Sequence, residues 1–493
     1  MRSHPSMPLR HPAIRFAAAL ATLAAFATLL LAAPRPAEAR PFDTGISGIG
    51  DYSPLSFDRT RDAGAGFVRL ALDWATVAPQ SAPANWQPDN PADPSYNWSY
   101  IDLGVREAVR AGLNPVLLVD GAPRWAQRCV TPPGLQATEA CDPDPAQLAA
   151  FATAAARRYS GSFGNLPRVQ YWQGLNEPNL TLFFYPQFDT SGKSLSPALY
   201  RALINAFYGA VKAVNPTNLV LAAGLGPTEL RGYNIGPMKF ARELLCMKGT
   251  AKPKPIKGQC KEGVHFDIFD IHPYTTGGPT HEGRANDVQM GDLGKLQTLL
   301  KAADRAGRIQ GAFKRTPLWI TEFSWDSSPP DPGGLPMKIL TQWASEAFHE
   351  AWANGVTRFF WYGLHDDPFG PNSSLSAQGG LYFRGDTLAA DQPKEVLVSF
   401  HFPFVAFARK QGLEFWGRTP NSGAGPVQLQ IFSGGSWRKL KLVEADKVGI
   451  FKGTVATRYG RGKRGAVRAL HGGQQSVPFP MKRVGDFRHP PFG

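Results

Sequence analysis

The sequence predicts an α/β protein: a (β/α)8 TIM barrel followed by a small all-β sandwich domain. Between residues 43 and 400, short apolar runs alternate with helix-like segments, a pattern typical of repeated βα units. Eight such runs can be counted, and some, such as residues 116–119, are apolar throughout, as expected for strands buried on both faces of a parallel sheet. Beyond about Val405, short alternating runs are separated by glycine and proline, which is typical of a small β-sandwich.

The expected elements follow in chain order. The barrel strands are predicted at 43–49, 67–74, 115–120, 169–175, 219–224, 266–272, 318–322 and 358–362. Helices are predicted at 99–111, 145–159, 197–214, 293–306 and 337–354, and sandwich strands at 413–417, 427–433, 437–443, 449–455 and 466–469. A doubly wound sheet is the competing architecture, but Gly45, Gly48 and Gly50 have the two spacings of the dinucleotide fingerprint in reverse order.

The N-terminus predicts export. Arginines precede an apolar run over residues 16–33, and the small-residue site Ala37-Glu38-Ala39 follows, with cleavage expected before Arg40. A membrane anchor is the alternative, although the run is at the lower limit for a span. The expected organisation is a signal peptide at 1–39, a barrel domain at 40–403, a β-sandwich accessory module at 404–475 and a loosely ordered tail at 476–493. The mature protein is expected to be secreted or held at the cell envelope, with no membrane span.

The four cysteines form two local pairs, Cys129 with Cys141 and Cys246 with Cys260. An oxidising destination favours two short-loop disulfides. A metal site is the alternative, but the chain has no CxxC spacing and no histidines cluster beside these cysteines.

The net charge of +14 is unevenly distributed. Residues 401–493 hold 16 Lys and Arg against 4 Asp and Glu, whereas the central domain is nearly neutral. This pattern argues against a nucleic-acid partner for the barrel. It leaves open a contact between the basic module and an anionic envelope or polysaccharide, with solvated surface charge as the commoner explanation.

Two carboxylates stand at predicted strand ends, which is where barrels carry their functional side chains. The fourth strand leads into Leu175-Asn176-Glu177-Pro178, and the seventh ends in Thr321-Glu322-Phe323. These two motifs resemble the signature of clan A glycoside hydrolases. The run Tyr96-Asn97-Trp98-Ser99, Asp102, Gly112-Leu113-Asn114-Pro115 and Ala122-Pro123-Arg124-Trp125-Ala126 is most similar to family 39, with family 5 next. The C-terminal module is covered by neither resemblance.

The resemblance implies a retaining hydrolase of β-linked glycosides in which Glu177 is the general acid/base and Glu322 the nucleophile. It further implies that Arg69 keeps Glu322 ionised, that Tyr274 donates a hydrogen bond to it, and that Asn176 contacts the sugar 2-hydroxyl. His272 would help to orient these side chains. Trp361 would form an apolar platform under the sugar, with Trp125 as a possible neighbour.

No cofactor and no metal are expected, because two carboxylates and water suffice for hydrolysis. The expected partner is a carbohydrate substrate. A transglycosylase remains an alternative because it uses the same residues, and so do a catalytically silent polysaccharide-binding protein and an adhesive role for the basic module. Asp366 and Asp367, after the eighth strand, could bind substrate hydroxyls, although a solvated turn is the commoner role for such residues.

Overall fold

The computed structural model describes residues 41–132, 139–260, 262–369, 377–410, 412–457 and 465–490. The predicted signal peptide at 1–39 lies outside the described residues. Within those ranges, no helix has both the length and the apolar character needed to cross a membrane.

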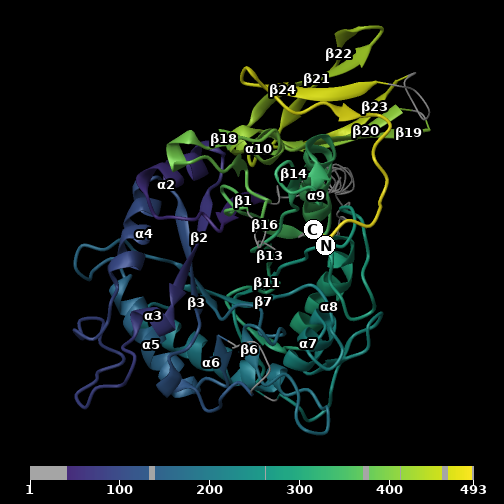
Figure 1. Cartoon of the computed structure of the whole chain (residues 1–493). Coiled ribbons are helices and arrows are strands. Elements are labelled where there is room, and N and C mark those ends of the chain that lie inside the picture. Colours follow the sequence, from purple (N-terminus) through teal and green to yellow (C-terminus); the bar gives the residue numbers. More distant parts are fainter. Residues whose placement is uncertain are drawn as a thin grey trace, which may run out of the picture. The chain divides into compact units, whose positions relative to one another are not determined.

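Eight parallel strands close into the predicted barrel, in the order β1, β2, β3, β5, β7, β11, β13 and β16, with β16 pairing back onto β1 (Figure 1). The prediction of a (β/α)8 barrel is therefore confirmed. The strands are β1 (Asp43–Ser47), β2 (Phe67–Asp73), β3 (Asn114–Asp120), β5 (Tyr171–Gly174), β7 (Leu219–Leu225), β11 (Ile268–Ile271), β13 (Leu318–Ile320) and β16 (Val356–Tyr362). Strands β11 and β13 end one and two residues before the predicted limits, so His272 and Glu322 lie in the loops that follow them.

Helices follow most barrel strands, and their starts have local causes. Helix α5 begins where the Asp144 carboxylate accepts hydrogen bonds from the backbone N–H groups of Ala146 and Gln147, with Pro145 in the first turn. The helices are α2 (Pro54–Asp62), α3 (Trp74–Val77), α4 (Ser99–Arg110), α5 (Pro145–Arg158), α6 (Ser196–Val214), α7 (Pro237–Leu244), α8 (Leu293–Arg305), α9 (Met337–Ala353) and α10 (Val396–His401).

Two-residue strands occur within the loops. They are β4 (Ala140–Cys141), β6 (Phe184–Tyr185), β8 (Met247–Lys248), β9 (Lys254–Pro255), β10 (Val264–His265), β12 (Ile309–Gln310), β14 (Ser327–Ser328), β15 (Leu335–Pro336), β17 (Tyr382–Phe383) and β18 (Gln392–Pro393). Both predicted disulfides are present, with Cα atoms 5.3 Å apart for Cys129–Cys141 and 6.0 Å apart for Cys246–Cys260.

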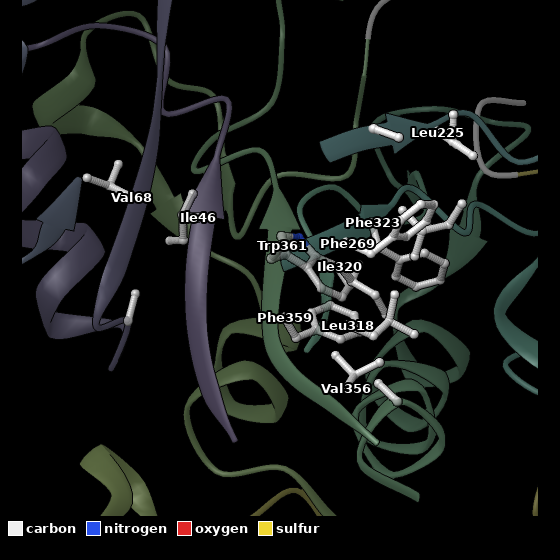
Figure 2. Close-up of a cluster of buried hydrophobic side chains, with 14 of the residues drawn as sticks. Ile46, Val68, Leu225, Phe269, Leu318, Ile320, Phe323, Val356, Phe359 and Trp361 are labelled. Carbon is white, nitrogen blue, oxygen red and sulfur yellow. The ribbon is translucent and has the colours of Figure 1, made fainter. Parts of the chain in front are cut away.

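The barrel has two hydrophobic layers because successive side chains of a strand point to opposite faces. One face packs into the barrel interior, where a separate cluster contains Phe67, Val116, Leu221, Ile268, Trp319 and Phe360. The other face packs outward into the main core, which includes Ile46, Val68, Ile320, Phe359 and Trp361 (Figure 2). Each large apolar side chain buried in this way contributes about 1.5–3 kcal/mol.

The C-terminal module consists of two antiparallel sheets, one with the order β19-β20-β23 and one with β22-β21-β24-β25, to which β26 adds beside β24 (Figure 1). Its strands are β19 (Phe404–Arg409), β20 (Gly412–Arg418), β21 (Gly425–Ser433), β22 (Ser436–Ala445), β23 (Ile450–Ala456), β24 (Ala466–His471), β25 (Gln474–Gln475) and β26 (Phe479–Pro480). Buried Trp416 of β20 contacts the rings of Phe42 and Trp352, so this sheet shares the core of the barrel domain.

The segment 476–490, expected to be loosely ordered, makes specific contacts. Phe479 of β26 pairs with Val467 of β24, and Phe487 packs on Trp343 with ring centroids 4.7 Å apart. The Asp486 carboxylate accepts a hydrogen bond from the backbone N–H of Gly278 and lies 2.9 Å from Nδ1 of His281. These apolar and polar contacts hold the segment against the loop that follows β11.

Candidate active site

The interior face of the barrel changes from apolar to polar on or just after five of its strands. Residues two positions after an interior apolar side chain point to the same face. This places Arg69 after Phe67, and likewise Gln173 after Tyr171, Asp270 after Ile268, Thr321 after Trp319 and Tyr362 after Phe360. The apolar cluster is thus the floor of a polar site at the carboxyl ends of the strands.

Glu177 lies in the loop after β5, and three backbone donors fix that loop to neighbouring strands. The N–H of Leu175 donates to Val119 O, that of Asn176 to the Asp120 carboxylate, and that of Glu177 to Gly224 O. Leu175 and Glu177 have positive φ angles of 63° and 38°, a conformation that non-glycine residues rarely adopt. The neighbouring structure holds Glu177 in this strained conformation, with its side chain nearly buried.

Gly224 allows this close packing. It has φ of +49°, and a Cβ atom at this position would lie 2.6 Å from Nε2 of Gln173. A larger residue would therefore displace Gln173, which accepts a hydrogen bond from Nε of Arg69.

Arg69 connects Glu322 to Asn176, the residue that precedes Glu177. Its Nη1 donates to Oε1 of Glu322 at 2.6 Å, and its Nη2 donates to Oδ1 of Asn176 at 2.7 Å. The Tyr274 hydroxyl donates to the other oxygen of Glu322, Oε2, at 3.3 Å. Both oxygens of Glu322 therefore accept hydrogen bonds, which favours the ionised form of the carboxyl group.

His272 lies between the two glutamates and is fully buried. Its Nδ1 is 2.8 Å from Oε1 of Glu177, and its Nε2 is 3.8 Å from Oε1 of Glu322 and 3.0 Å from the Thr321 hydroxyl. The hydroxyl of Thr321 donates its single proton to the Asp270 carboxylate, so it can only accept from Nε2–H of His272. Nε2 is therefore protonated, and the contact between Nδ1 and Glu177 contains a proton that the two groups share.

The two glutamates experience different electrostatics. Burial raises the pKa of Glu177, against the opposing effect of His272. Burial would also raise the pKa of Glu322, but the charges of His272 and Arg69 outweigh it and hold that pKa below its ordinary value. Glu177 thus retains its proton to higher pH, whereas Glu322 stays ionised to lower pH. A proton donor needs the first property and a nucleophile needs the second.

Six of the eight residues predicted from the sequence lie in this contact network: Arg69, Asn176, Glu177, His272, Tyr274 and Glu322. Trp125 does not. Its Nε1 donates to Pro79 O, and its ring contacts those of Trp74 and Trp86.

The prediction that Trp361 forms a platform under the sugar is wrong, because this side chain is 0% exposed. It points away from the barrel interior into the outer core, where its ring packs against Phe323 and Phe348 (Figure 2). Its neighbour Tyr362 points to the interior face and lines the cavity beside Glu322. Alternation along β16 places Tyr362 on the same face as Phe360, but only the structure shows that this face is the interior one.

Sequence reasoning also missed Gln173 and Asp270, which bond to each other at 2.8 Å beneath the site. The signal was available, since each is a polar residue within an otherwise apolar strand. Asp366, considered above as a solvated turn or a substrate ligand, is neither, because it is buried against Nζ of Lys394.

A cavity of about 480 Å³ opens beside Glu322, a volume within the range typical of ligand pockets. Its lining comes mainly from the β1 loop, β2 and the start of α4, and includes Arg69, Tyr100, Glu322 and Tyr362.

Comparison with solved structures relates this fold to known enzymes. A family 39 glycoside hydrolase from the gut symbiont Bacteroides cellulosilyticus WH2 superimposes with a TM-score of 0.52 at 17% identity, over 85% of this chain and 81% of that chain. The chain has the fold of family 39 glycoside hydrolases.

Two further structures that are similar to this chain are also enzymes. A monomeric β-xylosidase from Caulobacter crescentus CB15 gives a TM-score of 0.49 at 14% identity, over 91% of this chain and 96% of that chain. A family 39 enzyme from Xanthomonas axonopodis pv. citri gives 0.48 at 12% identity, over 87% and 94%. No protein-family model matches the chain, and a comparison with curated proteins gives no match.

Proposed function

We propose that this protein is a secreted retaining glycoside hydrolase that cleaves β-linked glycosides or polysaccharides. One observation carries the proposal: Glu177 and Glu322, in the loops after β5 and β13, flank a single buried imidazole, and their pKa values are shifted in opposite directions. The fold shared with glycoside hydrolases supports the same conclusion.

In the first step, a carboxylate oxygen of Glu322 attacks the anomeric carbon and forms an ester bond to the sugar. The bond between that carbon and the glycosidic oxygen breaks, and Glu177 transfers its proton to the leaving oxygen. In the second step, Glu177 removes a proton from water, whose oxygen displaces Glu322 from the anomeric carbon. Two inversions give a product with retained configuration.

Neighbouring residues have positioning roles in this mechanism. His272 shares a proton with Glu177, and Arg69 and Tyr274 keep the charge of Glu322 in place. Arg69 also bonds to Oδ1 of Asn176, which orients the Asn176 side chain and leaves its amide nitrogen to donate to the sugar 2-hydroxyl.

The test is an assay of the mature protein on a panel of aryl β-glycosides and β-linked polysaccharides, with the first product anomer followed by NMR. Release of the β-anomer supports a retaining hydrolase. Release of the α-anomer would contradict the double displacement, and transfer to added sugar in preference to water would favour the transglycosylase. A folded protein with no turnover on a broad panel would favour a polysaccharide-binding protein.

The contact between Arg69 and Glu322 predicts a change in pH dependence. The reaction needs ionised Glu322, so activity falls as the pH drops through the lowered pKa of this group. Replacing Arg69 with methionine removes a cation that lowers this pKa, so the acidic limb of kcat/KM should move to higher pH. We also expect kcat/KM to fall by about 100-fold, as for loss of one charge-stabilising donor.

The matched variant is Arg69→Lys, which keeps the charge but lacks the planar fork that bonds to Gln173, Asn176 and Glu322. Its acidic limb should stay near that of the parent protein while kcat/KM falls. An unchanged acidic limb in Arg69→Met would contradict the role given to Arg69.

Two expectations stay predictions. Export would be tested by sequencing the N-terminus of protein recovered outside the cell, where cleavage leaves Arg40 first. Contact of the basic module with an anionic envelope or polysaccharide is also untested, although β22 carries exposed Arg438, Lys439 and Lys441.

A further inference from the structure

The described lining of the cavity beside Glu322 includes one of the two proposed catalytic residues. Glu322 lines it, whereas Glu177 is not among its described lining residues, which also include Asn97, just before α4, and Tyr100 and Ile101 in the first turn of α4. In the proposed mechanism Glu322 bonds to the anomeric carbon of the sugar that is cleaved, whereas Glu177 meets the leaving group. We therefore assign the cavity to the side of the sugar that Glu322 attacks.

An exposed aromatic ring is part of this lining. Tyr100 is 56% exposed, although it lines a cavity, and its ring stacks on that of Tyr52 with centroids 4.3 Å apart and an interplanar angle of 14°. One face of the Tyr100 ring is thus covered by Tyr52. The other face is available to a ligand, and such a ring offers a large contact area with little loss of conformational entropy.

The stacked rings of Tyr52 and Tyr100 are held in place by packing against helix α4. Tyr52 is buried and packs against Gly104 of α4, where a Cβ atom would lie 2.6 Å from Cδ2 of the Tyr52 ring. Glycine is an unfavourable residue inside a helix, and its use here makes room for Tyr52. Tyr52 in turn supports Tyr100, four residues before Gly104 on the same helix.

The polar lining indicates the kind of ligand. Oδ1 of Asn97 accepts from the backbone N–H and the hydroxyl of Ser99, so the amide nitrogen is the atom of this side chain that can donate to a sugar hydroxyl. Among the described residues that line the cavity, Arg69 is the sole Lys or Arg, and it is already bonded to Glu322, Gln173 and Asn176. No lining cation is left for the carboxylate or sulfate of an acidic sugar, so the site fits a neutral sugar.

We propose that Tyr100 and Asn97 form a binding site for a second, neutral sugar unit, joined to the non-reducing side of the sugar that Glu322 attacks. This inference rests on the proposed function and deepens it. The enzyme would then act on substrates with at least two sugars on that side and release oligosaccharides rather than single sugars.

The test compares aryl β-glycosides of a monosaccharide with those of the matching β-linked disaccharide, using xylose with xylobiose and glucose with cellobiose. In the parent protein, kcat/KM should be about tenfold higher for the disaccharide, which corresponds to the upper part of the contribution of a stacked aromatic contact. Tyr100→Ala should lower this ratio by about five- to tenfold, whereas Tyr100→Phe, which keeps the ring, should preserve it.

Leu103→Ala is the matched control, because Leu103 is 45% exposed on the same helix and does not line the cavity. Its ratio should equal that of the parent protein. An equal kcat/KM on both members of a pair, or a ratio unchanged by Tyr100→Ala, would overturn the second sugar site while leaving the hydrolase intact. Absence of turnover on both members of every pair, together with no turnover on the broad panel, would instead contradict the proposed function itself.

Discussion

Replacing Glu322 with alanine should lower kcat/KM by about 10⁴-fold or more, because the variant has no atom that can form the bond to the anomeric carbon. Glu322 is held by Arg69 and Tyr274 in a site where its oxygens accept hydrogen bonds and its pKa is lowered. The loss should appear on every substrate that the parent protein hydrolyses, whatever its leaving group, since both steps pass through this carboxylate. Steady-state kinetics on an aryl β-glycoside measures the effect.

Added azide provides a second measurement on the same variant. The small anion can enter the space left by the carboxylate and attack the anomeric carbon from the same side, while Glu177 still protonates the leaving group. The product should be a glycosyl azide of inverted configuration, detectable by NMR. Near-parental activity of Glu322→Ala, with the fold verified by circular dichroism, would contradict the assignment of the nucleophile.

Replacing Glu177 with alanine should have an effect that depends on the leaving group. For poor leaving groups that need protonation, we expect kcat/KM to fall by about 10²- to 10⁴-fold, the usual contribution of a general acid. For activated aryl glycosides, the first step needs little protonation and should be much less affected. A series of aryl glycosides of different leaving-group pKa, compared between the variant and the parent protein, measures this dependence.

The pH profile gives an independent check on Glu177. The first step uses the protonated form, so in the parent protein kcat/KM should hold above the ordinary pKa of a glutamate and fall as the pH passes through the raised pKa. The basic limb should disappear in Glu177→Ala. The control is Glu444→Gln, which changes an exposed glutamate on β22 and should leave both limbs unchanged. A basic limb that persists in Glu177→Ala would assign that limb to another group.

The titration of His272 is linked to that of Glu177. Because Glu177 and His272 share a proton and both have raised pKa values, their titrations are coupled. The basic limb therefore belongs to the pair rather than to either residue. A variant such as Glu177→Gln, which keeps a hydrogen-bonding side chain, should lower the apparent pKa of His272, because it removes a neighbouring negative charge.

Much of the molecule could be predicted from the sequence alone. The eight barrel strands and the main helices follow from local periodicity, which depends only on residues close together in the chain. The candidates Glu177 and Glu322 follow from motifs at strand ends, because a parallel barrel brings all the carboxyl ends of its strands to one face. The cysteine pairs, being close in sequence, were accessible in the same way.

Other features were decided only by tertiary structure. Which face of β16 carries Trp361 depends on the register of strand pairing, and the observed register turns Trp361 outward and Tyr362 inward. The stacking of Tyr100 on Tyr52 joins a helix to the loop before α2, and the network of Gln173, Asp270 and Thr321 joins β5, β11 and the loop after β13. Local pattern determines which residues form a strand or helix, but contacts between distant segments determine which side chains meet, and these depend on how the whole barrel closes.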